Sequence, residues 1–267
     1  MVFLCMLLAM MPLPRVSIIT SVWDGDLFIE GFLTDITRQT IFSECELILV
    51  NANSPGNEEP VIKRYQEKYP NIVYRKLPYD PGLYGVWNYA IRMASAPLIA
   101  NANLDDRNRV DALERQAEAL ERNLSIDLVY AAHLLTQFPN ETLENNRFHG
   151  GMNPPEFSPR YMFLCLPGPR PMWRKSLHDR YGYFSESFSS AGDYEFWLRA
   201  VSGGARFQKI PGVLFLVYVN PRGLSTDPSP EKVRRRELEL ELIARGYPEL
   251  CAQWDFNVPP AKAPDGF

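Results

Sequence analysis

The chain has 267 residues, and 46% of them are hydrophobic, which suffices for the core of one large α/β domain or two small ones. Its 28 basic and 32 acidic residues give a formal net charge of -4, so nothing in the charge balance points to nucleic acid as a partner. The four cysteines stand far apart without a CxxC spacing, which argues against a zinc site or a disulfide framework and indicates a reducing compartment: Cys5, Cys45, Cys165 and Cys251.

Segment 1–14 is almost entirely apolar and leads directly into the first predicted strand. It is too short to span a bilayer, no positive residue precedes it, and Ala9-Met10-Met11-Pro12 is a poor signal-cleavage site. We expect an apolar N-terminal extension; a true start at Met10 or Met11, a membrane-touching anchor and a cleaved signal remain open alternatives. The predicted location is cytoplasmic, either free or peripheral at the membrane.

From Arg15 onward, strands and helices alternate along the chain. Residues 16–22 form a β-branched run, and the apolar spacing of 28–36 predicts a helix that Asp24 caps. The following segments continue the alternation, with strands over 46–50, 72–75 and 97–102, a helix over 58–68, and, after a turn at 80–82, a helix through 90–94. The order βαβαβαβ requires right-handed crossovers and predicts a mostly parallel sheet.

The second half of the chain is less regular. An amphipathic helix over 110–122 and a strand over 127–133 precede a long stretch, 137–171, which is rich in Pro, Asn, Gly and aromatic residues and is expected to cover a site. The pattern then predicts a helix over 192–200, a strand over 213–219, a charged helix over 229–245, and a disordered tail from Asn257.

Polar residues follow three of the predicted strands at their carboxyl ends, where an open parallel sheet binds its ligands. The segments are 20–24 (TSVWD), 51–54 (NANS) and 103–106 (NLDD). They offer an aromatic surface, hydrogen-bonding groups for a base and a ribose, and two adjacent carboxylates. The chain has no GxGxxG turn after the first strand and no Gly-Lys-Ser phosphate loop, which argues against a dinucleotide or P-loop site.

The adjacent carboxylates of Asp105 and Asp106 repel each other unless a cation or hydrogen bonds compensate. Magnesium and manganese prefer oxygen ligands, so a metal-diphosphate site is one interpretation of the pair. The other is that both residues merely open the next helix, because acids are favoured near helix N-termini.

Seven segments carry a resemblance to a known family: 16–20 (VSIIT), 46–51 (ELILVN), 87–91 (WNYAI), 99–106 (IANANLDD), 173–176 (WRKS), 182–186 (GYFSE) and 192–199 (GDYEFWLR). In this order they resemble the family 2 glycosyltransferases of the GT-A fold, over roughly residues 15 to 225. The resemblance implies an α/β fold with a Rossmann-like, mostly parallel sheet flanked by helices. Residues 15–228 would form one domain, with a nucleotide-binding half (15–107) and an acceptor half (108–228), before a C-terminal helix and tail (229–267).

The same resemblance implies an inverting transfer of a sugar from a UDP- or GDP-type donor to the hydroxyl of a glycan or lipid-linked acceptor, in polysaccharide, glycolipid or glycoprotein glycan biosynthesis. Asp193 falls on the position of the catalytic base, and Asp105 and Asp106 fall on the motif that binds Mn²⁺ or Mg²⁺. The residues expected at the nucleotide are Thr20, Ser21, Trp23, Asn53 and Asn88. Trp173 and Arg174 are expected at the acceptor or the diphosphate.

Three amides depart from the family's pattern: Asn51 and Asn53 stand where acids are common, and Asn103 occupies the first acid position of the metal motif. Fewer carboxylates predict looser metal binding. No histidine follows Asp193, where some relatives supply a late metal ligand, and Asn220 or Ser225 stands in that region. Two other functions remain open on the sequence, a catalytically silent nucleotide-sugar-binding protein and a sugar-phosphate nucleotidyltransferase.

Overall fold

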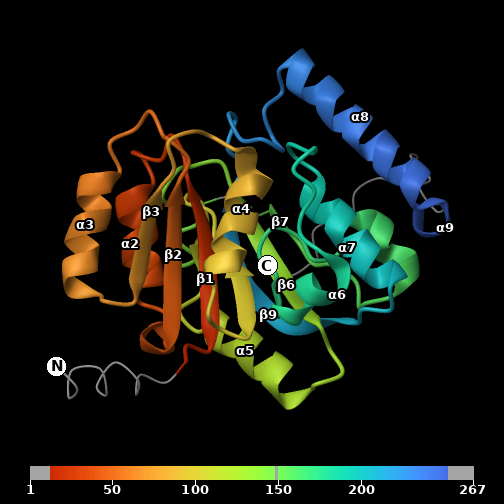
Figure 1. Ribbon diagram of the computed structural model, residues 1–267, viewed down its shortest axis with the longest axis horizontal. Coiled ribbons are helices and arrows are strands. Elements are labelled where there is room, and N and C mark those ends of the chain that lie inside the picture. Colours follow the sequence, from red (N-terminus) through yellow and green to blue (C-terminus); the bar gives the residue numbers. More distant parts are fainter. Residues whose placement is uncertain (1–12, 148–149, 252–267) are drawn as a thin grey trace.

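The computed structural model describes residues 13–147 and 150–251, and the described strands form one sheet (Figure 1). The sheet order is β3-β2-β1-β4-β8-β6-β9-β5, with β7 paired to β6 beside this path. The first four strands are parallel: β3 (Ile72–Lys76), β2 (Cys45–Asn51), β1 (Val16–Val22) and β4 (Leu98–Asn101). This confirms the predicted βαβαβαβ half.

The other strands make the sheet mixed. β8 (Met172–Arg174) lies antiparallel between β4 and β6 (Leu128–Thr136), and β6 runs parallel to β9 (Phe207–Tyr218). Two short strands pair antiparallel with these, β5 (Arg107–Asn108) with β9 and β7 (Gly150–Met152) with β6. Because β8 reverses direction between them, β4 and β6 point the same way, and both end toward the same edge of the sheet.

Helices cover both faces of the sheet, and each face has its own apolar core (Figure 1). Val16 and Ile18 of β1 point into one core and Ile19 into the other, as the alternation of side chains along a strand requires. The first core contains the buried faces of α2 (Ile29–Ile36), α3 (Glu59–Lys68) and α5 (Ala112–Arg122). The second contains residues of α4 (Gly82–Met93), α6 (Ser176–Tyr181), α7 (Gly192–Ser202) and α8 (Pro230–Gly246).

Several sequence predictions need correction. Asp24 does not cap the first helix, since that helix begins at Ile29 and Asp24 lies in the preceding turn with a φ of 44°. The strand predicted over 213–219 is the second half of the longer β9, whose pairing with β6 shifts register near Pro211 and Gly212. A proline and a glycine in mid-strand hide such a strand from its sequence pattern.

The remaining short elements are the 3₁₀ helices η1 (Phe42–Glu44) and η2 (Pro159–Leu164) and the last described helix, α9 (Pro248–Cys251). Stretch 137–171 contains β7 and η2. The apolar segment through residue 12 and the tail from residue 252 lie outside the described residues, as do the predictions for them. Within the described ranges, Cys45 and Cys165 are free thiols, and no helix has the length and apolar character needed to cross a membrane.

Candidate active site

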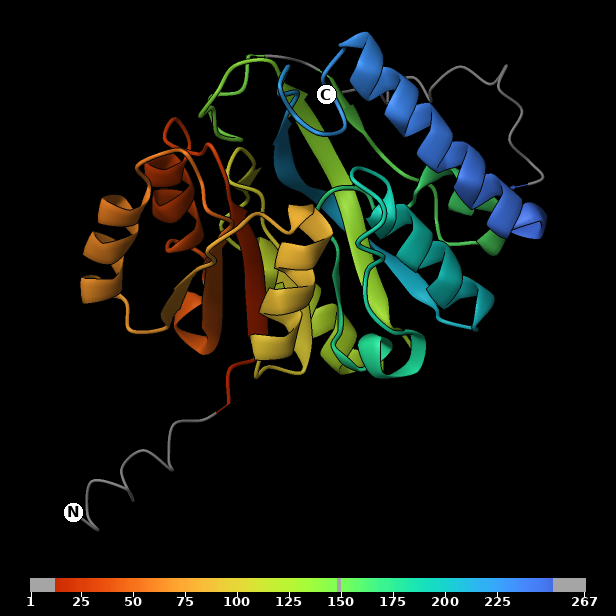
Figure 2. The same cartoon turned by 45° about the horizontal axis from the view of Figure 1, so that its top comes forward.

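The carboxyl ends of β1, β2 and β4 form one edge of the sheet, and the segment after β9 returns to it (Figure 2). Two contacts fix that return. The Asn220 side-chain amide donates a hydrogen bond to Asp105 (3.1 Å), and the guanidinium of Arg222 lies 3.6 Å from the carboxylate of Asp24. The edge therefore gathers residues that stand almost two hundred positions apart in the sequence.

The predicted nucleotide-contacting residues lie on neighbouring loops at this edge, although not all are open to solvent. Val22 at the end of β1 pairs with Asn51 at the end of β2, which places the loops after both strands side by side. Trp23 is 48% exposed, Asn53 is exposed, and Ser21 is half-buried. Thr20 is fully buried and its hydroxyl has no hydrogen-bond partner, so it does not reach the open surface of the edge.

Asn88, which the sequence predicts at the nucleotide, makes its hydrogen bonds inside the protein. Its side chain on α4 is buried, donates to the Phe184 carbonyl (2.9 Å) and to the Glu186 carboxylate (3.0 Å), and accepts from the Phe184 amide (3.0 Å). These three bonds use both N–H groups and the oxygen of the Asn88 amide, and their partners lie on the loop between α6 and α7. Asn88 therefore fixes that loop against α4.

Trp173 and Arg174 do not lie at the open edge either. Trp173 is fully buried in the second core and donates its indole N–H to Nε2 of His178 (2.9 Å). Arg174 pairs with Leu98 at the amino end of β4, opposite the candidate site, and its guanidinium donates to backbone carbonyls around the end of α5. The segment expected at the acceptor or the diphosphate is a core strand here, and at three residues it is too short to show an alternating pattern.

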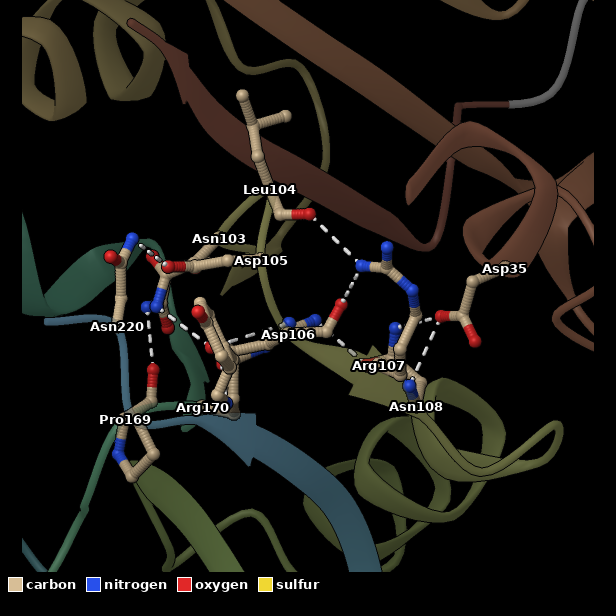
Figure 3. A network of polar contacts seen from close by, with 12 residues as sticks. Asp35, Asn103, Leu104, Asp105, Asp106, Arg107, Asn108, Pro169, Arg170 and Asn220 are labelled. Carbon is tan, nitrogen blue, oxygen red and sulfur yellow. Dashed lines mark hydrogen bonds and ion pairs between the residues drawn. The ribbon is translucent and has the colours of Figure 1, made fainter. Parts of the chain in front are cut away.

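Asp106 points into the protein (Figure 3). It is 2% exposed, and its carboxylate accepts hydrogen bonds from the Asn103 side chain (2.9 Å) and from the Tyr218 amide (3.2 Å). The guanidinium of Arg170 lies 4.0 Å away. Burial, together with the charge of Asp105, raises the pKa of Asp106 to about 7.

A buried polar network extends from Asp106 beneath the edge (Figure 3). Arg170 donates to the Asn108 side chain (2.7 Å), and Asn108 donates through its backbone and its side chain to the carboxylate of Asp35. Arg107 donates to the carbonyl oxygens of Leu104 and Asp106, which fixes the turn after β4. Two arginines and two carboxylates thus compensate one another, and Asp106 belongs to this framework.

Asp105 is the carboxylate that faces the open edge. It is half-buried, and the hydrogen bond from Asn220 engages one of its oxygens. In residues 13–147 and 150–251, no group of three or more His, Cys, Asp or Glu side chains is placed to hold a metal ion. Magnesium commonly binds one or two carboxylates together with substrate phosphates, and a site shared between Asp105 and a diphosphate fits this chemistry. Of the two predicted metal-binding carboxylates, Asp105 is the one that faces the open edge, whereas Asp106 is buried.

Asp193 lies in the first turn of α7 and is held by α4. Its Oδ1 accepts hydrogen bonds from the hydroxyl of Tyr84 (3.0 Å) and from the Tyr194 amide (2.9 Å). Tyr84 stands in the first turn of α4, which follows the carboxyl end of β3, so Asp193 belongs to the same edge as Asp105. Burial raises the pKa of Asp193, and the hydrogen bond from Tyr84 opposes that rise.

One loop joins the two acidic regions. Burial and the nearby charge of Asp193 raise the pKa of the Cys165 thiol. Four residues later the carbonyl of Pro169 accepts a hydrogen bond from the Asn101 side chain (2.8 Å), and Arg170 then reaches Asp106. The loop lies in stretch 137–171, which was expected to cover a site, but sequence reasoning did not single out Arg170, because a single arginine among prolines and glycines forms no recognisable motif.

Comparison with known proteins shows the family of the chain and two relatives. The model of the family described as "Glycosyl transferase family 2" matches residues 17–179. A 92-residue stretch is 36% identical to the minor teichoic acid biosynthesis protein GgaB of Bacillus subtilis (strain 168), covering 34% of this chain and 10% of that relative. The uncharacterized glycosyltransferase MJ1057 of Methanocaldococcus jannaschii is 23% identical over 74% of this chain and 68% of its own.

The solved structures show the fold. Residues covering 90% of this chain superpose on 67% of S. aureus TarS 1-349 in complex with UDP-GlcNAc, with a TM-score of 0.69 and 18% identity. The mannosyltransferase PcManGT from Pyrobaculum calidifontis, in complex with GDP-Man and Mn²⁺, matches 79% of this chain and 59% of its own with a TM-score of 0.60 and 18% identity. The fold is therefore of the GT-A type, as expected from the sequence.

Proposed function

We propose, since the chain belongs to glycosyl transferase family 2, that it is an inverting glycosyltransferase which moves a sugar from a nucleotide-diphosphate sugar to an acceptor hydroxyl. The observation that carries the proposal is the arrangement of Asp193, a carboxylate anchored through one oxygen by Tyr84 at the edge that also presents Asp105. The chain spans a tenth of GgaB and about two thirds of MJ1057 and TarS 1-349.

The donor is proposed to be a UDP- or GDP-type sugar, because the solved relatives were captured with UDP-GlcNAc and with GDP-Man. Ser21, Trp23 and Asn53 are the residues proposed to contact the base and the ribose, because they lie on the loops after β1 and β2. The acceptor is proposed to be a glycan or lipid-linked chain of a polysaccharide, and the similarity to GgaB, a minor teichoic acid biosynthesis protein, supports this.

In the proposed reaction, the acceptor oxygen attacks the anomeric carbon from the face opposite the diphosphate. A new carbon–oxygen bond forms, the bond to the diphosphate oxygen breaks, and the acceptor proton passes to Asp193. Tyr84 holds the carboxylate in place for this transfer. A divalent cation, Mn²⁺ or Mg²⁺, held by Asp105 would neutralise the charge that grows on the departing nucleoside diphosphate.

The raised pKa of Asp193 suits a base that acts near neutral pH, because proton transfer is most efficient when the pKa of the base lies near the working pH. The residue must be ionised to accept a proton. Turnover is therefore expected to rise with pH through the raised pKa of this carboxyl and to fall on acidification.

The test compares wild type with Asp193→Asn. Binding of UDP and GDP is measured by isothermal titration with and without Mn²⁺, and turnover of UDP-GlcNAc and GDP-Man is followed by release of nucleoside diphosphate. We expect Asp193→Asn to bind nucleotide within twofold of wild type and to lose about a hundredfold or more in turnover. Asp105→Ala should lose the Mn²⁺-dependent part of nucleotide binding.

Two outcomes would replace the proposal. If wild type binds nucleotide but turns over neither donor, and Asp193→Asn changes nothing, the chain is a nucleotide-sugar-binding protein. If wild type forms nucleoside triphosphate from a nucleotide sugar and pyrophosphate, it is a sugar-phosphate nucleotidyltransferase.

A further inference from the structure

The C-terminal helix α8 lies beyond residues 17–179, which the family model matches, and it carries one buried carboxylate. Glu239 is 6% exposed, whereas Glu237 and Glu241 on the same helix are exposed and pair with surface arginines. Burying a carboxylate is costly unless hydrogen bonds or charges compensate, so the partners of Glu239 indicate what it does.

Glu239 accepts hydrogen bonds from the three residues directly before α7, and the guanidinium of Arg235 on its own helix lies 3.6 Å from its Oε1. Its Oε1 accepts from the amide (2.7 Å) and the hydroxyl (2.6 Å) of Ser189, and its Oε2 accepts from the amide (3.0 Å) and the hydroxyl (2.9 Å) of Ser190. Oε2 also accepts from the amide of Ala191 (3.0 Å). These bonds lower the pKa of Glu239, so its ionised form is the one that the fold holds.

Ala191 is the N-cap residue of α7, directly before Gly192, and its methyl side chain cannot accept a hydrogen bond from the helix. The amide groups at a helix N-terminus need acceptors, and negative charge is favoured there by the helix dipole. Glu239 supplies both the acceptor oxygens and the negative charge, although it lies on a different helix, α8. Packing supports the same contact, because Ile243 is buried in the second core and the hydroxyl of Tyr247 donates to Glu195 of α7 (2.7 Å).

Asp193 follows Ala191 by two residues, so the segment that Glu239 clamps is the one that sets where Asp193 lies. We infer that Glu239 is a positioning residue for the transfer reaction, which ties the C-terminal helix to the first turn of α7 and holds Asp193 against Tyr84. This inference rests on the proposed function, because it takes Asp193 as the base. It gives helix α8 a part in catalysis although no α8 residue is proposed to touch a substrate.

The electrostatics supply a second readout beside kcat, the pKa of Asp193. Titratable groups near Asp193 include Tyr84 from α4, Cys165 from the loop after η2, and Glu239 from α8, which is itself paired with Arg235 of the same helix at 3.6 Å. The hydroxyl of Tyr84 lowers the pKa of Asp193 by its hydrogen bond, whereas the negative charge of Glu239 raises that pKa. Removing the charge of Glu239 should therefore move the acid limb of turnover to lower pH.

The test is Glu239→Gln, with Glu241→Gln as the matched control, since the control makes the same change at an exposed position on the same helix. Turnover of UDP-GlcNAc and GDP-Man with Mn²⁺ is measured against pH, and the titration of Asp193 is followed by carbon NMR of ¹³C-labelled aspartate, assigned with Asp193→Asn. We expect Glu239→Gln to lose about tenfold in kcat with the donor KM within twofold, because a displaced catalytic group is costly. The pKa of Asp193 should fall, and the control should match wild type.

Ser190→Ala provides a milder variant in case Glu239→Gln folds poorly, since it removes one of the five bonds. It should lower kcat by a smaller factor at unchanged donor KM. The inference is overturned if Glu239→Gln and Ser190→Ala lose only thermal stability, with kcat and the titration of Asp193 as in the control. If wild type turns over neither donor, the proposed function fails. The inference about Glu239 fails separately if NMR gives the same pKa of Asp193 in Glu239→Gln as in Glu241→Gln.

Discussion

The hydroxyl of Tyr84 offers the sharpest test of the base. Tyr84 is 2% exposed and donates to Oδ1 of Asp193 at 3.0 Å, and Tyr84→Phe removes that donor while keeping the buried ring. The amide of Tyr194 then remains as the donor to Oδ1. A hydrogen bond to a charged group contributes about 1.5 kcal/mol or more, so the ionised form of Asp193 should lose stabilisation of this order.

The direction of the expected pH shift follows from the role of Asp193 as the base. Because the lost hydrogen bond favours the carboxylate, the pKa of Asp193 rises in Tyr84→Phe, and the acid limb of turnover moves to higher pH. On that limb, 1.5 kcal/mol corresponds to a loss of about tenfold in turnover, which recovers as pH increases. Glu239→Gln is expected to shift the limb in the opposite direction.

The assay is the pH dependence of kcat for nucleoside diphosphate release at saturating donor. Tyr74→Phe is the matched control, since the Tyr74 hydroxyl donates to Glu59 (3.3 Å) between β3 and α3, away from Asp193. A Tyr84→Phe profile that coincides with wild type, or that moves to lower pH, would refute the assignment of Asp193 as the base held by Tyr84.

Three further predictions concern the framework of the site. In urea unfolding without metal, Asp106→Ala should lower the free energy of unfolding by about 2 kcal/mol or more, because it leaves buried donors unpaired. Asp105→Ala should lower it by less than about 1 kcal/mol, and equal losses would contradict the different orientations of the two side chains. Gly192→Ala should lower kcat without weakening nucleotide binding. The Cβ of the alanine would lie 2.7 Å from the ring of Tyr84 and force that ring or α7 to move. A wild-type kcat in this variant would show that the ring of Tyr84 is not held there. Burial lowers the pKa of His178 from 6.5 to about 4, so the unfolded chain binds more protons than the folded chain between these pH values. Up to about 3 kcal/mol of stability is therefore lost as pH falls from 6.5 to 4. In His178→Gln the urea midpoint should decline less steeply over this range, and a decline equal to that of wild type would contradict the prediction.

The parallel half of the sheet could be predicted from the sequence because each of its elements has a strong local period. The β-branched run of β1 and the apolar face of α2 appear in the order that a parallel sheet requires. Strand β8 could not be predicted, since three residues carry no period and its central residue, Trp173, was interpreted as a ligand contact. Its position depends on pairing with β4 and β6, which are distant in sequence.

The candidate site was predictable in its location and less so in its details. Asp105 and Asp106 are adjacent in sequence, yet one faces the edge and the other joins the buried network with Arg170. Their difference follows from β5 and β9, whose pairing brings the Tyr218 amide onto Asp106. Glu239 had no local signal either, because it is one of several acids on a charged helix and only the tertiary structure buries it.

The stereochemistry at the anomeric carbon tests the central claim most directly. Proton NMR can follow the hydrolysis or transfer of α-linked UDP-GlcNAc and GDP-Man from the first minutes, before released sugar equilibrates between its anomers. Direct displacement assisted by Asp193 predicts that the first product is the β-anomer, and that its formation stops in Asp193→Asn. An α-anomer as the first product, or an unchanged rate in Asp193→Asn, would contradict an inverting transfer with Asp193 as its base.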